Sequence, residues 1–211
     1  MRFMKKRVYA FVLVVMMLAI TACASSDEGD FTIGTTTETY YENEYFGIRY
    51  TPTNNMVLQD EAYIKQVNAA MISMLDDENV KKSLESGNSI TIAYAVNQDS
   101  TCTFNIIVQN VKSLFQKNVS DDYIIDQSLD PTKELLESMG VFDSVKVTKG
   151  TANFLGKDVV SMDVEAKVGG YDFYETEVLL RKGNYVMFIT VGAYFDKATL
   201  QTLLNDVQSI E

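Results

Sequence analysis

Residues 145–193 read VKVTKGTANF LGKDVVSMDVEAKV GGYDFYETEVLLRK GNYVMFITVGA, and this stretch decides the fold. Apolar and polar side chains alternate along it, as they do in half-buried strands. Gly156-Lys157, Gly169-Gly170 and Gly183-Asn184 interrupt the alternation with residues that suit tight hairpin turns. The pattern predicts a four-strand antiparallel meander with strands at 145–154, 159–168, 171–182 and 185–193.

The Gly169-Gly170 turn sets the register between the second and third strands of the meander. A two-residue turn would place Glu175 and Glu177 on the face that carries the apolar side chains of the second strand. Because burying two unpaired carboxylates is costly, we expect a β-bulge near Phe173-Tyr174 that turns Val178 inward instead.

With such a bulge, acidic side chains gather on the outer face of the meander. Glu175 and Glu177 would lie near the outward-facing Asp163 and Glu165. Solvation explains charges on an outer face. A functional acidic binding face is the alternative interpretation.

Further strands and helices precede and follow the meander. Leu179, Val186 and Phe188 are apolar on its second face, so at least one helix should cover part of that face. The predicted fold class is therefore α+β, with a largely antiparallel sheet and helices on one or both faces. The other predicted elements are strands at 38–42, 45–51, 90–96 and 102–109, and helices at 63–74 (with a short continuation to Gly87), 121–139 and 197–207.

The N-terminus has the pattern of an export signal over residues 1–22. A basic head is followed by the uninterrupted apolar run Val8–Ile20, which is too short for a permanent membrane span. Ile20-Thr21-Ala22-Cys23 resembles the lipobox of bacterial lipoproteins, which implies that Cys23 carries a diacylglyceryl group and becomes the first residue after cleavage. A free-secretion signal with an incidental cysteine is the alternative. Two acyl chains hold a protein stably at a bilayer, so we expect a lipid-anchored protein with its domain on the extracytoplasmic side of the bacterial membrane.

The composition of the chain after the signal separates a tether from a folded domain. Residues 23–37 are small and polar after the cysteine, which predicts a flexible tether, and residues 38–211 have the length of a single domain.

Removing the four basic residues of the signal changes the formal net charge from −11 to −15. Nucleic acid and anionic lipid headgroups are therefore poor partners for the domain. The expected partners are the membrane, through the lipid, and an unidentified protein or small molecule.

Residue counts exclude several chemistries. The chain has no histidine, which excludes Ser-His-Asp and Cys-His catalysis and the ordinary zinc sites. Once Cys23 is lipidated, Cys102 is the one thiol left, and it alternates with apolar residues of a predicted strand. The aspartates at 121–122 and 126–130 lack the spacing of an EF-hand loop, so helix capping and solvated charge explain them better than calcium. We expect no catalytic residue, no cofactor and no metal site.

An aromatic hairpin opens the domain with the sequence YYENEYFGIRYTP at residues 40–52. This hairpin, a helix, a long meander and a last strand and helix together resemble the PsbP-like fold family over about Glu38–Glu211. The resemblance implies an α/β/α sandwich, and it implies an accessory or adaptor role in place of catalysis.

Two functional hypotheses follow from these observations. The first is a non-catalytic binding or accessory domain that uses exposed Tyr40, Tyr45 and Arg49, or the acidic sheet face, to bind a protein or a small ligand. The second is a carboxylate-dependent enzyme, such as a cell-wall glycan hydrolase. That enzyme would need two carboxyl groups roughly 5 to 10 Å apart in a cleft, one of them with a raised pKa.

Overall fold

The structure is a computed structural model and describes residues 31–74, 89–111 and 119–210. The export signal and Cys23 lie outside these residues, and so does the helix continuation expected to end at Gly87. Within the described ranges, no helix has the length and apolar character needed to cross a membrane.

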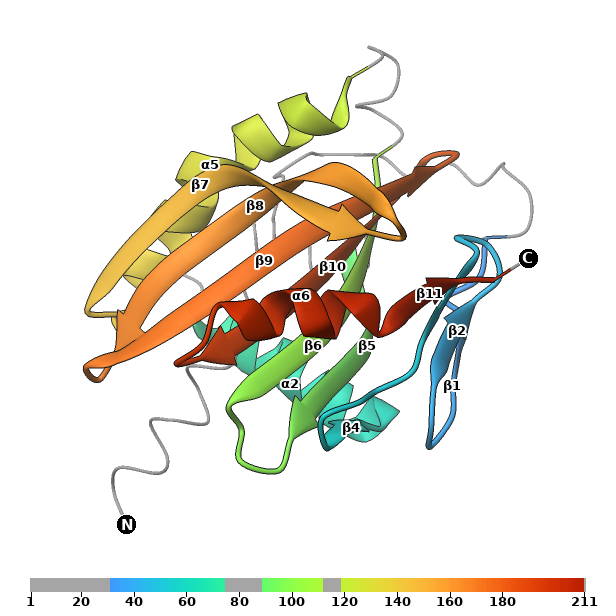
Figure 1. The fold of residues 1–211 in the computed structure, drawn as a ribbon, viewed down its shortest axis with the longest axis horizontal. Helices are drawn as coiled ribbons and strands as arrows, with labels where there is room; N and C mark the ends of the chain where they lie inside the picture. The colour runs from blue at the N-terminus through green and yellow to red at the C-terminus, as the bar shows by residue number, and fades with distance from the viewer. Residues whose placement is uncertain (1–30, 75–88, 112–118, 211) are drawn as a thin grey trace.

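A seven-stranded antiparallel sheet forms the centre of the fold (Figure 1). In spatial order its strands are β4 (Met56–Leu58), β5 (Ser89–Asn97), β6 (Cys102–Asn110), β10 (Tyr185–Tyr194), β9 (Tyr171–Lys182), β8 (Lys157–Val168) and β7 (Ser144–Phe154). Strands β7 to β10 confirm the predicted meander. The first turn consists of Leu155 and Gly156, with φ of 51° and 74°, and not of Gly156-Lys157, because the register pairs Phe154 with Lys157.

A smaller four-stranded sheet lies beside the C-terminal helix. Its strands are β1 (Thr35–Thr36), β2 (Tyr41–Asn43), β3 (Ile48–Tyr50) and β11 (Val207–Ser209), and the described helices are α2 (Glu61–Met74), α5 (Asp121–Ser138) and α6 (Ala198–Asn205). The aromatic hairpin predicted at 38–51 corresponds to β2 and β3. Tyr50 of this sheet stacks on Phe104 of β6 with 3.5 Å between ring centroids, which joins the small sheet to the core.

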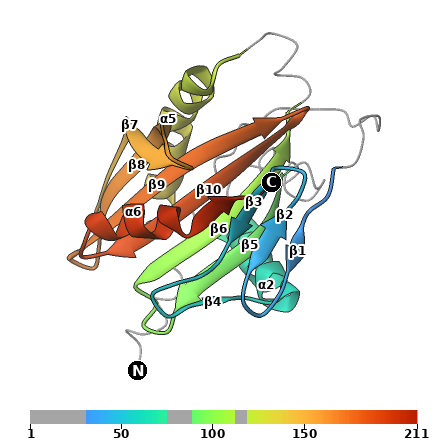
Figure 2. The ribbon, with the colours of Figure 1, turned by 45° about the vertical axis from the view of Figure 1, so that its right-hand side comes forward.

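Helices cover both faces of the large sheet (Figures 1 and 2). On one face, α6 packs its leucines against β7, β9 and β10. On the other face, α5 packs on β7 and β8, while α2 packs on β5. Each face has its own apolar core, so the α+β class with a mainly antiparallel sheet and helices on both faces is present as predicted.

The predicted boundary of the flexible tether at residue 37 is too late. Thr35 and Thr36 pair with Glu42 and Tyr41, and the ring of Phe31 stacks on Tyr185 with 4.0 Å between centroids. Composition alone suggested a tether because this segment is mostly threonine and glycine. One aromatic ring and a short strand pairing nevertheless place residues 31–37 against the folded domain.

The predicted β-bulge near Phe173-Tyr174 is absent. Strands β8 and β9 pair without a register shift, so Met162 lies opposite Glu177 and Val164 lies opposite Glu175. The side chains of Glu175 and Glu177 therefore enter the core, where the two residues are 4% and 0% exposed. A bulge would have turned the buried ring of Phe173 or the buried Leu179 away from the α5 side, and the regular register avoids that loss of apolar burial.

Candidate functional site

A polar strip crosses the central strands on the face covered by α2 and α5. It consists of Glu175 and Glu177 on β9, Thr190 on β10, and Thr103 and Asn105 on β6. The two helices flank this strip, because α5 packs on β7 and β8 whereas α2 packs on β5. These five polar side chains lie on a sheet face whose core is mainly apolar and which also carries the buried Gln109 of β6.

Strand pairing brings these residues together from distant parts of the chain. Thr190 lies opposite Glu177 on one side and opposite Asn105 on the other, which makes one transverse row. Gly192 lies opposite both Glu175 and Thr103, which makes the adjacent row. The two glutamates are two residues apart on one strand, so their Cα atoms are separated by roughly 7 Å.

All members of the polar strip are buried. Glu177, Thr190, Asn105, Glu175 and Thr103 are 0%, 1%, 3%, 4% and 5% exposed. Position 192 is too crowded for a side chain, since a Cβ there would lie 2.7 Å from Thr103 Oγ1 and 3.3 Å from the ring of Phe173. Thr103 and Phe173 therefore fill the space above Gly192 in the row of Glu175.

Three acceptor atoms of the strip have no hydrogen-bond donor. Thr190 Oγ1 donates to Glu177 Oε2 over 2.9 Å. In the described part of the chain, Glu177 Oε1, Glu175 Oε1 and Asn105 Oδ1 have no partner. Buried polar atoms in native proteins are nearly always paired, so three such atoms in one strip require an explanation.

The environment favours the neutral form of both carboxyl groups. Burial raises the pKa of Glu177 to about 8, although the hydrogen bond from Thr190 opposes this shift. Burial also raises the pKa of Glu175 well above its ordinary value, and the neighbouring charge of Glu177 adds to the effect. At neutral pH the strip therefore holds protonated carboxyl groups in an apolar core.

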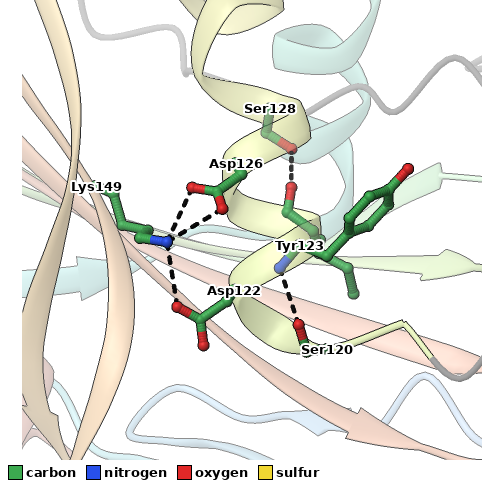
Figure 3. Close-up of polar contacts among 7 residues, drawn as sticks. Ser120, Asp122, Tyr123, Asp126, Ser128 and Lys149 are labelled. Carbon is green, nitrogen blue, oxygen red and sulfur yellow. Dashed lines mark hydrogen bonds and ion pairs between the residues drawn. The ribbon is translucent and has the colours of Figure 1, made fainter.

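The N-terminal half of α5 is held beside the strip by capping and ion pairs. Ser120 Oγ accepts a hydrogen bond from the backbone N–H of Tyr123 over 3.1 Å. Figure 3 shows Lys149 of β7 between two aspartates of the helix, with its Nζ 3.0 Å from Asp126 Oδ1 and 3.2 Å from Asp122 Oδ1.

Arg181 provides a second tie between α5 and the sheet. It pairs with Asp121 and donates to the backbone carbonyl of Val119 over 2.8 Å. Arg181 lies on the same face of β9 as Glu177, four residues later, but these contacts direct its guanidinium toward α5. Within the described residues, no group of three or more His, Cys, Asp or Glu side chains is placed to share a metal ion.

The predicted aromatic surface is divided by the structure. Arg49 pairs with Glu42, and its guanidinium carbon lies 4.8 Å from the ring centroid of Tyr40. Tyr45 lies in the turn after β2, where its hydroxyl donates to the carbonyl of Lys182 over 2.9 Å. Tyr40 and Arg49 therefore lie together, whereas Tyr45 packs on the β9–β10 hairpin.

The predicted acidic face is also divided. Asp163 accepts hydrogen bonds from Ser161 and Thr176, each over 3.0 Å, on the α6 side of the sheet. Glu165 lies on that same side and pairs with Lys197 at 2.8 Å. Glu175 and Glu177 lie on the opposite side, so the four acidic residues do not form one surface.

Sequence reasoning did not single out Asn105, Thr103 or Thr190. The signal for these residues is the presence of isolated polar side chains inside apolar strand sequences, such as Phe104-Asn105-Ile106. The sequence does not show that these residues are close together, because this depends on the strand order, which places β6, β10 and β9 next to one another.

The chain is similar in structure, but not in sequence, to known proteins. No protein-family model matches the sequence. No curated protein matches it. Among solved structures, the solution structure of cyanobacterial PsbP (CyanoP) from Synechocystis sp. PCC 6803 is similar to this chain with a TM-score of 0.48 and 9% sequence identity, covering 88% of this chain and 98% of that chain.

Proposed function

We propose that this protein is a non-catalytic binding domain that takes a small ligand at the polar strip. The observation that carries this proposal is the set of three buried acceptors without donors, Glu175 Oε1, Glu177 Oε1 and Asn105 Oδ1. Leaving one buried acceptor without a donor costs about 1–3 kcal/mol. A ligand with donor groups would supply the missing hydrogen bonds.

The place of the strip in the fold supports a ligand site. Small-molecule sites commonly lie between packed elements and combine apolar walls with a few convergent polar groups. Here the strip lies on the sheet between α2 and α5 and is bordered by buried Met162, Phe173 and Leu179. Three unpaired buried acceptors lower the stability of the fold, whereas a bound ligand would give each of them a partner.

We also propose that Cys23 carries a lipid that holds the domain at the extracytoplasmic side of a bacterial membrane. The basic head, the apolar run and the lipobox resemblance of residues 1–23 support this proposal. Growth with radioactive palmitate should label the protein, and Cys23→Ser should remove both the label and the membrane fraction. An unlabelled wild-type protein in the soluble fraction would contradict the anchor.

A carboxylate-dependent hydrolase is the second candidate function. The two glutamates offer a pair of carboxyl groups, because they project from the same face of β9 with their Cα atoms roughly 7 Å apart, and burial raises the pKa of both. Their burial, at 4% and 0% exposure, favours a small enclosed ligand over a polymeric glycan, which needs an open cleft. Release of reducing sugar from cell-wall glycan by wild type, abolished in Glu177→Gln, would favour the hydrolase.

A ligand screen tests the binding proposal directly. The full chain is heated with a panel of small polyols, sugars, amines and carboxylates, and its Tm is compared with that of Glu177→Gln. A ligand at 100 times its Kd should add about 2.7 kcal/mol to the free energy of unfolding of wild type. Glu165→Gln is the matched control, since Glu165 lies on the other side of the sheet. If no compound class raises the Tm of wild type, the proposed function is wrong.

A further inference from the structure

We propose that the polar strip takes a small organic ammonium ion, whose N–H groups donate to the free acceptors of Glu175, Glu177 and Asn105. This inference rests on the proposed function and names the class of ligand.

The hydrogen-bond inventory of the strip matches an ammonium group. In the ionised form of the two carboxyl groups the three unpaired atoms are all acceptors, and they belong to side chains on β9 and β6 that flank Thr190 of β10. A primary ammonium group offers three donors and no acceptor. A hydroxyl group offers one donor and adds an acceptor of its own, so it would satisfy one atom and introduce another that needs a partner.

Charge leads to the same class of ligand. Among the described residues, no lysine or arginine pairs with Glu175 or Glu177. The nearest cation along β9 is Arg181, whose guanidinium is engaged with Asp121 and the carbonyl of Val119. Lys149 is likewise held by Asp122 and Asp126. An ionised glutamate in the strip would therefore need a cation from outside the described structure.

The walls favour an organic cation over a metal ion. Met162 lies opposite Glu177, Tyr94 lies opposite Asn105, and the ring of Phe173 borders Gly192. Apolar and aromatic side chains suit a hydrocarbon body and attract ammonium groups through their ring faces. Calcium takes six to eight oxygen ligands, whereas the two carboxyl groups and the amide of this strip supply five, one of which already accepts from Thr190.

Binding of a cation must be linked to proton release. Burial raises the pKa of Glu177 to about 8 and raises that of Glu175 well above its ordinary value, so a carboxyl group that pairs with an ammonium ion must first lose its proton. The affinity should therefore increase with pH, by up to about tenfold per pH unit for each proton released, until the pKa of the carboxyl group is passed.

Other ionisable groups also lie on this side of the sheet. Burial raises the pKa of Tyr94 on β5, so its hydroxyl stays neutral throughout. The described residues here also include Tyr63 on α2, Tyr194 on β10, the pair Asp121 and Arg181, Lys149 with Asp122 and Asp126, and the helix pairs Lys65 with Glu61 and Lys133 with Glu137.

Isothermal titration of the full chain tests the inference. The probes are methylammonium, butylammonium and 2-phenylethylammonium, each with the alcohol of the same carbon skeleton as its neutral control. Titrations at pH 6, 7 and 8, in two buffers with different heats of ionisation, measure affinity and the number of protons released. At least one ammonium should bind at least tenfold more tightly than its alcohol, gain affinity from pH 6 to 8 and release about one proton.

Matched variants locate the binding. Glu177→Gln and Asn105→Leu should each weaken ammonium binding at least tenfold, and Glu177→Gln should reduce the pH dependence. Glu165→Gln should bind as wild type does. Circular dichroism confirms that each variant is folded before titration, and Glu175→Gln provides a second test of the pH dependence if Glu177→Gln is unfolded.

The outcomes separate this inference from the proposed function. If alcohols, sugars or divalent metal ions bind at the strip and ammonium ions do not, the ligand class is wrong while the binding function stands. If ammonium ions bind equally to wild type, Glu177→Gln and Asn105→Leu, the site is wrong. If neither these probes nor any compound of the thermal panel binds, both proposals are wrong.

Discussion

Met162 of β8 lies directly opposite Glu177 of β9, and both side chains are fully buried on the same face of the sheet. A methionine has no proton donor to offer a carboxylate. Strand register therefore holds Glu177 in the core without an ionic partner on β8. The stability of the fold should consequently depend on the protonation of this residue.

The free energy of unfolding should decrease as pH rises from about 4.5 to 8. The pKa of Glu177 is about 8 in the folded chain against an ordinary value of 4.5, so its contribution is complete below the ordinary pKa and is lost as pH rises through 8. The expected slope is about 1.4 kcal/mol per pH unit for each proton. Urea denaturation at half-unit steps of pH measures this slope, which Glu177→Gln should reduce.

Glu165→Gln is the control for that pH dependence. Lys197 holds the pKa of Glu165 below its usual value, so this residue titrates at more acidic pH. Its replacement should leave the slope between pH 5 and 8 unchanged. Equal slopes for wild type and Glu177→Gln would show that Glu177 is ionised in the folded chain.

Glu175→Leu should increase stability and remove ligand binding. Replacing a buried, unpaired carboxyl group with an apolar side chain of similar size should add about 1–3 kcal/mol at pH 8. Polar groups retained for function commonly lower stability in this way. Chemical denaturation and the titrations above provide the two measurements, and a less stable variant would contradict the assignment of Glu175 to an unsatisfied site.

Gly192→Ala should destabilise the domain by about 1–3 kcal/mol through overpacking. The new Cβ would lie 2.7 Å from Thr103 Oγ1. Thr103→Ala removes that oxygen, so the double variant should recover part of the loss. A double-mutant cycle in urea measures this coupling, and strictly additive effects would show that the two positions are not in contact.

Ser120→Ala should lower the stability by about 1 kcal/mol because it removes the N-terminal cap of α5. Ser138→Ala, in the last turn of the same helix, is the matched control, since its hydroxyl donates back to the carbonyl of Leu135 and caps no N–H group. Thermal denaturation should therefore show a lower Tm for Ser120→Ala than for Ser138→Ala. The reverse order would argue against the cap.

Phe31→Ala should destabilise the domain although its residue lies in the segment predicted to be a tether. The ring stacks on Tyr185 and contacts Tyr45 edge to face. Losing such an aromatic pair costs about 0.5–1.5 kcal/mol in addition to the lost burial. Ile33→Ala is the control, because Ile33 is 56% exposed, and its unfolding midpoint should match that of wild type.

The meander could be predicted from the sequence because its signals are local. Each hairpin turn carries glycine, and apolar alternation extends through each strand between the turns. Fold class followed from the same pattern, since Leu179 and Phe188 required cover on the second face. The structure does cover Leu179 and Phe188 with helices, but it places them in the same core as Met162 and not on a separate second face, because the predicted bulge is absent.

The polar strip could not be predicted because its signals are not local. The predicted bulge assumes that Glu175 and Glu177 are ionised and therefore places them on the outer face of the sheet. A protonated carboxyl group is much less costly to bury, so regular pairing with β8 prevails. Asn105 and Thr190 are 85 residues apart in sequence, and strand order alone places Thr190 between Asn105 and Glu177.

The contact of Phe31 with Tyr185 limits how far the domain can reach from its proposed anchor. With residues 31–37 held against the fold, only the seven residues 24–30 separate Cys23 from the folded domain. Even a fully extended chain of this length spans no more than about 25 Å. The protein would therefore sample a thin layer directly above the lipid headgroups, and it would encounter only those molecules that enter this layer.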